Sequence, residues 1–241
     1  MKAIILCAGL GSRLNSRKPK CLLEVNGQTI IDQIVINFLQ SGFKKKDIIF
    51  ATGFKNELIE KKFGKKYNYI FNRYYRSTNM VYTLFNCLKK IDNQDIIISY
   101  SDILYHYLNI KKIVKSKFET STLIDLNWKK IWIKKNKLLS DSETLKIKKN
   151  KIIELGKKTK DIKNIDGRYV GITKFSSSTL SNIKKIYFKN LKLNEKKFKK
   201  IDMTSFLNFL IKKKIIVTPL SLVRNWNEYD DTTDLKYYIK L

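Results

Sequence analysis

The chain has 241 residues, of which 50 are Lys or Arg and 21 are Asp or Glu, giving a formal net charge of +29 at pH 7. This length allows one large α/β domain or two small ones with a substantial core. No apolar run approaches the roughly 18 residues that cross a bilayer, and no N-terminal secretion signal is recognisable, so we expect a soluble, cytoplasmic protein without a membrane partner. The three cysteines lack metal-ligand spacing, which favours reduced thiols.

The positive charge comes almost entirely from lysines that are spread along the chain. The densest clusters, such as residues 44–46 and 196–200, fall at expected turns and helix ends, where solvated lysines are common. A charge of this size also suits nucleic-acid binding, and it would help to draw in a triphosphate. Polyanion binding therefore stays an alternative, but no nucleic-acid partner is expected.

The first half of the chain alternates between strand and helix patterns. Apolar runs predict strands at residues 2–8, 47–52, 67–72, 95–100 and 122–127. Helical patterns lie between them at residues 29–41, 56–63, 78–90 and 108–115. This alternation predicts an α/β fold with a mostly parallel central sheet flanked by helices. Ligands bind such sheets at the carboxyl ends of the strands.

The pattern changes after residue 130. Residues 145–149 and 151–155 predict two strands around a turn at Asn150-Lys151, and residues 168–175 predict a third. We interpret this segment as a small antiparallel insertion. Further elements are expected as helices at 177–186, 202–213 and 232–238 and as a strand near 215–218. Since no repeat or linker interrupts the pattern, we expect a single domain over residues 1–241.

The first strand runs directly into a glycine loop. Gly9 and Gly11 allow a tight turn that brings backbone N–H groups towards phosphate oxygens. Arg13 adds a planar fork suited to two phosphate oxygens, and Lys20 adds a compact charge. Neither the Walker motif nor the dinucleotide fingerprint fits this loop, and two glycines after a strand also serve plain strand-to-helix packing.

The complete pattern, Ala-Gly-x-Gly-Ser-Arg at residues 8–13 with Pro-Lys at residues 19–20, resembles the signature of the nucleotidylyltransferase family. The resemblance implies a Rossmann-like nucleotidyltransferase fold, in which residues 1–128 form the nucleotide-binding half and residues 129–241 the acceptor-binding and closing half. It implies that Arg13 and Lys20 are the catalytic cations. The nucleotide site implied by the resemblance consists of Cys7, Ala8, Gly9, Gly11, Ser12, Gly53, Phe54 and Ser101.

Nucleotidyl transfer needs a metal site, and two aspartates are expected to hold Mg²⁺. Asp102 follows the apolar strand at 95–100 and so reaches the same sheet edge as the glycine loop. Relatives carry a magnesium-binding Asp here, although Ser101 replaces their usual glycine. The segment Asn227-Glu-Tyr-Asp-Asp-Thr-Thr-Asp-Leu resembles the family's closing motif and implies Asp230 as the second ligand. For both aspartates the alternative is a helix or turn cap.

Two further features resemble the phosphocholine, 2-aminoethylphosphonate and phosphoamino-acid cytidylyltransferases. Only five residues separate Arg13 from Pro19, and residues 76–84 match a segment of that group in which Thr78 is expected to cap a helix while Asn79 points into the cleft. The resemblance implies transfer of CMP from CTP to a small zwitterionic phosphate or phosphonate, such as phosphoglutamine. Pyrophosphate would be released, and the product would serve surface polysaccharide decoration.

A zwitterionic acceptor needs a cation beside its phosphoryl group and carboxylate or aromatic partners for its amine. The resemblance of the central region implies an acceptor site made of Asn79, Asp125, Trp128, Glu143 and Tyr169. The alternative for the aromatic residues is a place in the core, and for Glu143 an ion pair with a lysine. His106 is expected to be a surface or helix-start residue, because a phosphate nucleophile needs no general base.

Two alternatives to this function remain at the level of sequence. One is a sugar-phosphate nucleotidylyltransferase that uses another nucleoside triphosphate, and the other is a basic nucleic-acid-binding protein that retains the fold. The expected partners are CTP and a small phosphorylated acceptor. A second copy of the chain, forming a homodimer, is the one candidate protein partner.

Overall fold

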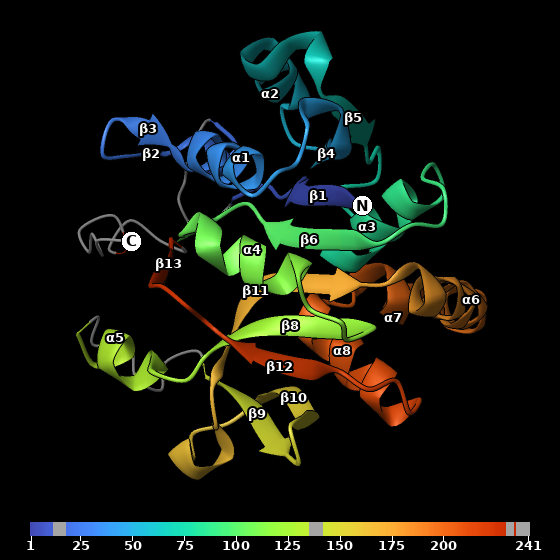
Figure 1. The fold of residues 1–241 in the computed structure, drawn as a ribbon. Coiled ribbons are helices and arrows are strands. Elements are labelled where there is room, and N and C mark those ends of the chain that lie inside the picture. The colour runs from blue at the N-terminus through green and yellow to red at the C-terminus, as the bar shows by residue number, and fades with distance from the viewer. Residues whose placement is uncertain (12–17, 135–141, 230–233, 235–241) are drawn as a thin grey trace.

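The computed structural model of the chain describes residues 1–11, 18–134, 142–229 and 234. A seven-stranded sheet forms its centre, in the order β12-β8-β11-β6-β1-β4-β5 (Figure 1). Neighbouring strands run parallel except at β11, which is antiparallel to both β6 and β8. The strand bounds are β1 (Lys2–Cys7), β4 (Ile48–Thr52), β5 (Asn68–Phe71), β6 (Ile96–Tyr100), β8 (Thr120–Asp125), β11 (Arg168–Phe175) and β12 (Thr218–Ser221).

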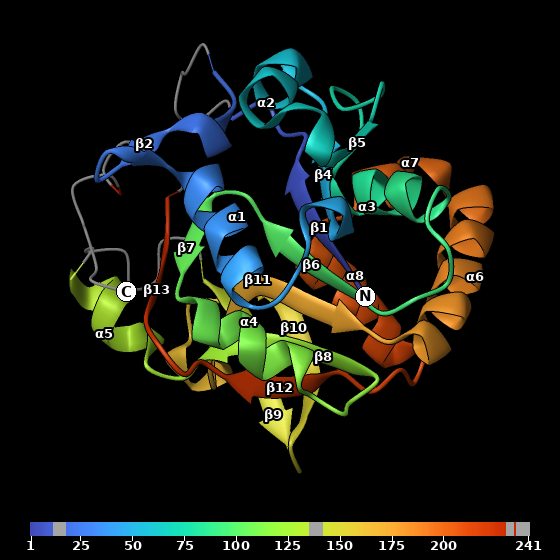
Figure 2. The same ribbon diagram turned by 45° about the horizontal axis from the view of Figure 1, so that its top comes forward.

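Apolar side chains cover both faces of this sheet, as the continuous apolar strands predict. Along β1, Ala3 and Ile5 belong to one buried cluster, whereas Ile4 and Leu6 belong to the other. Helices cover the two clusters on opposite sides (Figure 2). The first cluster includes residues of α1 (Ile30–Gln40), α2 (Asn56–Phe63) and α4 (Tyr107–Val114), and the second includes residues of α3 (Met80–Leu88), α6 (Ser177–Leu193), α7 (Glu195–Lys200) and α8 (Met203–Lys212).

Local capping explains where several helices begin. The side chains of Thr29, His106 and Asp202 accept hydrogen bonds from backbone N–H groups in the first turns of α1, α4 and α8. His106 is therefore a helix-start residue, as predicted. The cap of α3 is Asn79, whose side-chain oxygen accepts from the N–H of Met80 at 2.7 Å. The prediction that Thr78 caps this helix is wrong, because its hydroxyl donates to the carbonyl oxygen of Tyr74.

The second half of the chain departs from the predicted antiparallel insertion in one respect. β9 (Glu143–Lys148) and β10 (Lys151–Lys158) form the expected hairpin, with its turn one residue early at Lys149-Asn150, where both residues have positive φ. β11, however, lies in the central sheet between two parallel strands. Residues 168–175 therefore bring the second half of the chain to the centre of the molecule.

The strand predicted near 215–218 begins later, at Thr218, because Ile215 still donates to the carbonyl oxygen of Leu210 at the end of α8. Several short elements had no clear sequence pattern. They are β2 (Glu24–Val25), β3 (Gln28–Thr29), β7 (Ile103–Tyr105), α5 (Trp128–Lys134), α7 and β13 (Trp226–Glu228). The last predicted helix, at 232–238, lies outside the described residues apart from Asp234. Among the helices that the structure describes, none has the length and apolar character needed to cross a membrane.

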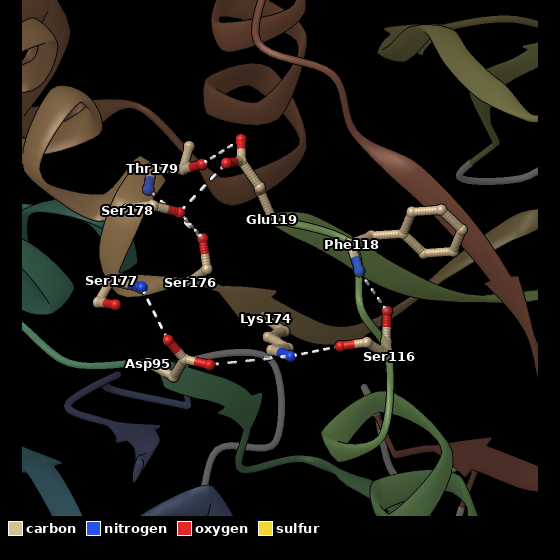
Figure 3. A network of polar contacts seen from close by, with 9 residues as sticks. All are labelled: Asp95, Ser116, Phe118, Glu119, Lys174, Ser176, Ser177, Ser178 and Thr179. Atoms are coloured by element: carbon tan, nitrogen blue, oxygen red, sulfur yellow. Dashed lines mark hydrogen bonds and ion pairs between the residues drawn. The ribbon is translucent and has the colours of Figure 1, made fainter.

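A network of polar contacts secures the start of α6 at the sheet edge where β6 and β8 begin (Figure 3). The Asp95 carboxylate accepts from the N–H of Ser177 at 2.8 Å and lies 3.9 Å from the buried ammonium of Lys174. Glu119 accepts from the hydroxyl groups of Ser178 and Thr179. This network lies at the opposite end of the strands from the functional residues described next.

Candidate active site

A cleft of about 760 Å³ opens at the sheet edge where β1 and β6 end. Its first wall is the glycine loop, which contributes Cys7, Ala8, Gly9 and Gly11 together with Lys20. Gly11 has a φ of +62°, and a Cβ atom there would lie 3.2 Å from the Cβ of Lys20. A glycine is needed at this position because the backbone turns through the left-handed region while passing close to Lys20.

Lys20 and Asp102 meet at the centre of the cleft, although 82 residues separate them in sequence. The Lys20 Nζ atom lies 2.7 Å from Asp102 Oδ2. Next to this pair, the Ser101 hydroxyl donates to the carbonyl oxygen of Leu6 at 2.8 Å. That bond ties the end of β6 to the end of β1, so the carboxylate and the glycine loop share one rigid support.

The other oxygen of Asp102, Oδ1, is buried and has no hydrogen-bond partner. A buried carboxylate oxygen without a partner is costly unless a cation or donor satisfies it, so this oxygen fits a metal ligand. Among the described residues there is no group of three or more His, Cys, Asp or Glu side chains arranged to hold a metal. The second expected ligand, Asp230, lies outside the described residues, as do Ser12 and Arg13.

The chain segment that leads to Asp230 runs directly past Asp102. β13 pairs antiparallel with β7, placing Glu228 opposite Ile103. The N–H of Tyr229 then donates to the carbonyl oxygen of Asp102 at 2.9 Å. Residues far apart in the sequence, at the end of β6 and near the C-terminus, are therefore side by side at the cleft.

Gly53 and Phe54, which were predicted to bind the nucleotide, are not among the described residues that line the cleft. They lie behind the glycine loop and support it. The N–H of Phe54 donates to the carbonyl oxygen of Ala8 at 3.2 Å. A Cβ atom on Gly53 would lie 2.6 Å from that same oxygen. The two residues thus pack against the back of the loop, and a side chain at position 53 would displace it.

Three of the five predicted acceptor residues line the cleft, namely Asn79, Glu143 and Tyr169. The structure does not bring the other two there. Asp125 is buried, and its oxygens accept from the N–H of Asn127 and from Trp226 Nε1. Trp128 is 1% exposed and packs in the first apolar cluster.

Tyr169 and Tyr100 form an aromatic pair in the lining of the cleft. Their ring centroids are 5.7 Å apart at an interplanar angle of 80°, and the Tyr169 hydroxyl lies 3.1 Å from Thr173 Oγ1. A Cβ atom on Gly171 would lie 2.8 Å from the Tyr100 ring. Burial raises the pKa of both tyrosines above the ordinary value, so their phenols stay neutral.

The cleft also contains charged residues that the sequence analysis did not assign: Arg168, Asp202, Glu228 and Asp234. Each had a signal in the sequence, since Arg168 begins a predicted strand, Asp202 begins a predicted helix, and the last two lie in the segment that resembles the closing motif. For Arg168 and Glu228 the missing information was the pairing of β11 and β13 with distant strands, which brings them to this sheet edge.

The two cysteines of the cleft are poor nucleophiles. Burial raises the pKa of Cys7 well above the ordinary thiol value and that of Cys21 to about 12. Both thiols are therefore neutral near pH 7, and the thiolate is the reactive form. What the described lining of the cleft offers instead is the backbone of the glycine loop and charged side chains.

Comparison with known proteins shows to which family the chain is related. Residues 3–108 match the family model for the MobA-like NTP transferase domain. The chain is 36% identical to the CTP:phosphoglutamine cytidylyltransferase of Campylobacter jejuni, and the alignment covers all of both chains.

Solved structures of low sequence identity share the fold. A putative glucose-1-phosphate thymidylyltransferase from Bacillus anthracis has a TM-score of 0.74 at 21% identity, over 98% of this chain and 92% of that one. The CTP:phosphocholine cytidylyltransferase of Streptococcus pneumoniae has a TM-score of 0.70 at 19% identity, over 98% and 96%. With a glycine loop, a Lys–Asp pair and a full-length relative in agreement, the chain belongs to the nucleotidyltransferase family that carries the MobA-like NTP transferase domain, and it is an enzyme of that class.

Proposed function

We propose that the chain is a Mg²⁺-dependent cytidylyltransferase that transfers CMP from CTP to a small phosphorylated zwitterion, with a phosphorylated amino acid such as phosphoglutamine as the leading acceptor. The observation that carries the proposal is the Lys20–Asp102 pair beside the glycine loop, since a cation and a carboxylate with one unsatisfied oxygen stand where a triphosphate and its metal would meet. The relative from C. jejuni supports the choice of nucleotide and acceptor, because the similarity extends over the whole chain.

The reaction is an in-line displacement at the α-phosphorus of CTP. An oxygen of the acceptor phosphate forms the new P–O bond, the bond to the β-phosphate breaks, and its electron pair leaves with pyrophosphate. Backbone N–H groups of the glycine loop, Arg13 and Lys20 would bind the triphosphate and stabilise the charge that grows on the leaving oxygens. Asp102 and Asp230 would hold Mg²⁺, which supplies further positive charge to the phosphates when bound.

A substrate panel tests the proposal. The purified chain is incubated with Mg²⁺ and each of the four nucleoside triphosphates, combined with phosphoglutamine, phosphocholine, aminoethylphosphonate or glucose 1-phosphate, and pyrophosphate release is measured. We expect turnover with CTP and an aminated acceptor and none when either substrate is omitted. Turnover with glucose 1-phosphate and another triphosphate would show the sugar-phosphate enzyme instead. Salt-dependent RNA binding without turnover would show a nucleic-acid-binding protein.

Asp102→Asn tests the metal site. The variant keeps the size of the side chain but removes the charge, so we expect kcat to fall about 100-fold or more while the melting temperature stays close to that of the wild type. Asp92→Asn, at an exposed position, is the matched control and should keep full activity. Activity of Asp102→Asn within a few fold of the wild type would contradict the assignment.

The proposed product has a place in the cell that can be checked separately. We propose that the enzyme works in the cytoplasm, where CTP is made, and that its product donates a zwitterionic group to a surface polysaccharide. Deletion of the coding sequence should remove that substituent from the isolated polysaccharide, and restoring the wild-type sequence should return it. A polysaccharide of unchanged composition would contradict this part of the proposal.

A further inference from the structure

Two cations occur among the described residues that line the cleft, and different elements carry them. Lys20 follows the glycine loop and is paired with Asp102 at 2.7 Å. Arg168 lies on the acceptor side, next to Tyr169. Transfer between two phosphates requires that the negative charge of the acceptor be brought against the negative charge of the triphosphate, so each of the two anions needs a cation.

The topology of β11 explains how Arg168 reaches the cleft. Because β11 runs antiparallel between β6 and β8, its first residue lies at the edge where those two strands end. Arg168 is opposite Asp125, the last residue of β8. In the same strand, Ile172 is opposite Ser99 of β6, which places the start of β11 beside the end of the strand that Asp102 follows.

The backbone around Arg168 is held on both sides. A Cβ atom on Gly167 would lie 3.2 Å from the carbonyl oxygen of Asp125, so the chain passes β8 closely just before the arginine. Just after it, Tyr169 is fixed by the hydrogen bond of its hydroxyl to Thr173 and by its contact with the Tyr100 ring. Such a support pre-organises the side chain that it carries.

We propose that Arg168 binds the phosphoryl group of the acceptor and holds it for attack on the α-phosphorus; this inference rests on the proposed function. A guanidinium is planar, always charged and able to donate two parallel hydrogen bonds to phosphate oxygens. Apart from Lys20 and Arg168, the charged residues in the described lining of the cleft are carboxylates, Glu143 and Asp202 among them, and a carboxylate matches an ammonium group. The phosphoryl end of a zwitterionic acceptor therefore faces Arg168, and its amine faces the carboxylates.

Steady-state kinetics of Arg168→Gln test this assignment. Loss of a charge-assisted, bidentate contact should raise the KM for phosphoglutamine about 10- to 100-fold while the KM for CTP stays within about twofold. Arg168→Lys keeps the charge without the fork and should give an intermediate KM, which also covers the case in which the glutamine variant does not fold. Arg73→Gln, at an exposed position outside the cleft lining, is the matched control and should change neither KM.

An unchanged acceptor KM in both Arg168 variants, or a rise confined to the KM for CTP, would overturn the inference. A second measurement separates the phosphoryl group from the carboxylate that an amino acid also carries. The inhibition constant of the analogue with hydrogen in place of the α-carboxylate should rise in Arg168→Gln by the same factor as the KM for phosphoglutamine. If the inhibition constant of this analogue is the same in Arg168→Gln as in the wild type, Arg168 binds the α-carboxylate instead of the phosphoryl group, and the inference is overturned.

The two proposals fail in different ways. The wild-type substrate panel decides the proposed function before any variant is made, because a wild type without cytidylyl transfer overturns that function. A wild type that turns over phosphoglutamine, with Arg168 variants whose acceptor KM is unchanged, overturns the role of Arg168 alone.

Discussion

Gly53 illustrates how a single residue fixes the shape of the cleft at the glycine loop. A Cβ atom at this position would lie 2.6 Å from the carbonyl oxygen of Ala8 and 2.7 Å from the Cβ of Tyr75. Both atoms belong to segments that line the cleft, so a methyl group would push apart the glycine loop and the segment before α3. The requirement for glycine arises from space, since its φ lies outside the left-handed region.

Gly53→Ala should therefore destabilise the protein by about 1–3 kcal/mol, which corresponds to a melting temperature lower by several degrees. Differential scanning calorimetry measures this shift. Gly9→Ala is the matched control, because nothing lies within 4 Å of a Cβ atom at that position and its φ is also outside the left-handed region. Equal melting temperatures for the two variants would contradict the steric argument.

Individual site residues differed in how well the sequence predicted them. Lys20 and Asp102 were expected at one sheet edge because each follows a central parallel strand, and the structure joins them at 2.7 Å. Asp125 ends β8 and Trp128 follows it, but the sequence did not reveal that Trp226 would donate a hydrogen bond to a buried Asp125. Arg168 was missed because its place depends on the pairing of β11 with two distant strands.

At the scale of elements, the start of α6 depends on a cap and on the network behind it (Figure 3). The hydroxyl of Ser176 accepts from the N–H of Thr179. Ser176→Ala should lower the free energy of unfolding by about 1 kcal/mol, because this donor loses its acceptor. Urea titration measures the effect. Ser177→Ala is the control, since only the backbone of Ser177 takes part in the described network; an equal loss in both variants would contradict the capping role of Ser176.

The cap of α4 should respond to pH. The pKa of His106 is lowered from its ordinary value, first by burial and then by the charge of Arg224. The neutral ring accepts a hydrogen bond from the N–H of Leu108, and protonation removes that acceptor. Because the pKa in the folded state lies below that in the unfolded state, the stabilisation is present above about pH 6.5 and is lost as the pH falls through the lowered pKa.

His106→Asn supplies a cap that does not titrate. The difference between the melting temperatures, wild type minus variant, should therefore be larger at pH 7.5 than at pH 5.0. Thermal unfolding in matched buffers measures this difference. A difference that does not change between the two pH values would show that the cap does not depend on the protonation of His106. The predictions of the helices were partly confirmed: α2 and the start of α6 lie at the expected residues, but α6 continues to Leu193, past its predicted end at 186, and α7 was not predicted. Short strands such as β7 and β13 were not predicted either, since their pairing partners are more than a hundred residues away.

Across the whole molecule, the net charge of +29 should oppose compaction. Salt shortens the screening length from about 10 Å at 0.1 M to about 3 Å at 1 M, which weakens repulsion among the lysines. Salt also weakens ion pairs such as Lys2–Asp47, but surface pairs contribute little each. We expect the melting temperature to rise by several degrees when NaCl is increased from 0.05 to about 0.5 M, as calorimetry would show. A melting temperature that falls with salt would mean that attractive pairs dominate.

The overall architecture was largely predictable, because apolar runs and helical periods alternate in the first half of the chain. The position of residues 168–175 was not. The residue pattern of a strand is the same whether the strand belongs to a hairpin or to the central sheet. The sequence of residues 168–175 therefore does not show which of the two it joins. The sequence could thus identify the elements of the second half without identifying how they join the first.

The antiparallel direction of β11 also has an evolutionary consequence. The parallel strands β1 and β6 place at the cleft the residues that follow each strand, whereas the antiparallel β11 places there the residues at its own start. The segment from β9 to the start of β11 is therefore separate in sequence from the loops after β1 and β6 and can change without altering them. Glu143, Arg168 and Tyr169 of the proposed acceptor site lie in this one stretch of about 30 residues, so substitutions there after gene duplication could alter acceptor choice while the chemistry is kept. Exchange of that stretch between homologous enzymes is correspondingly a rational starting point for engineering acceptor choice.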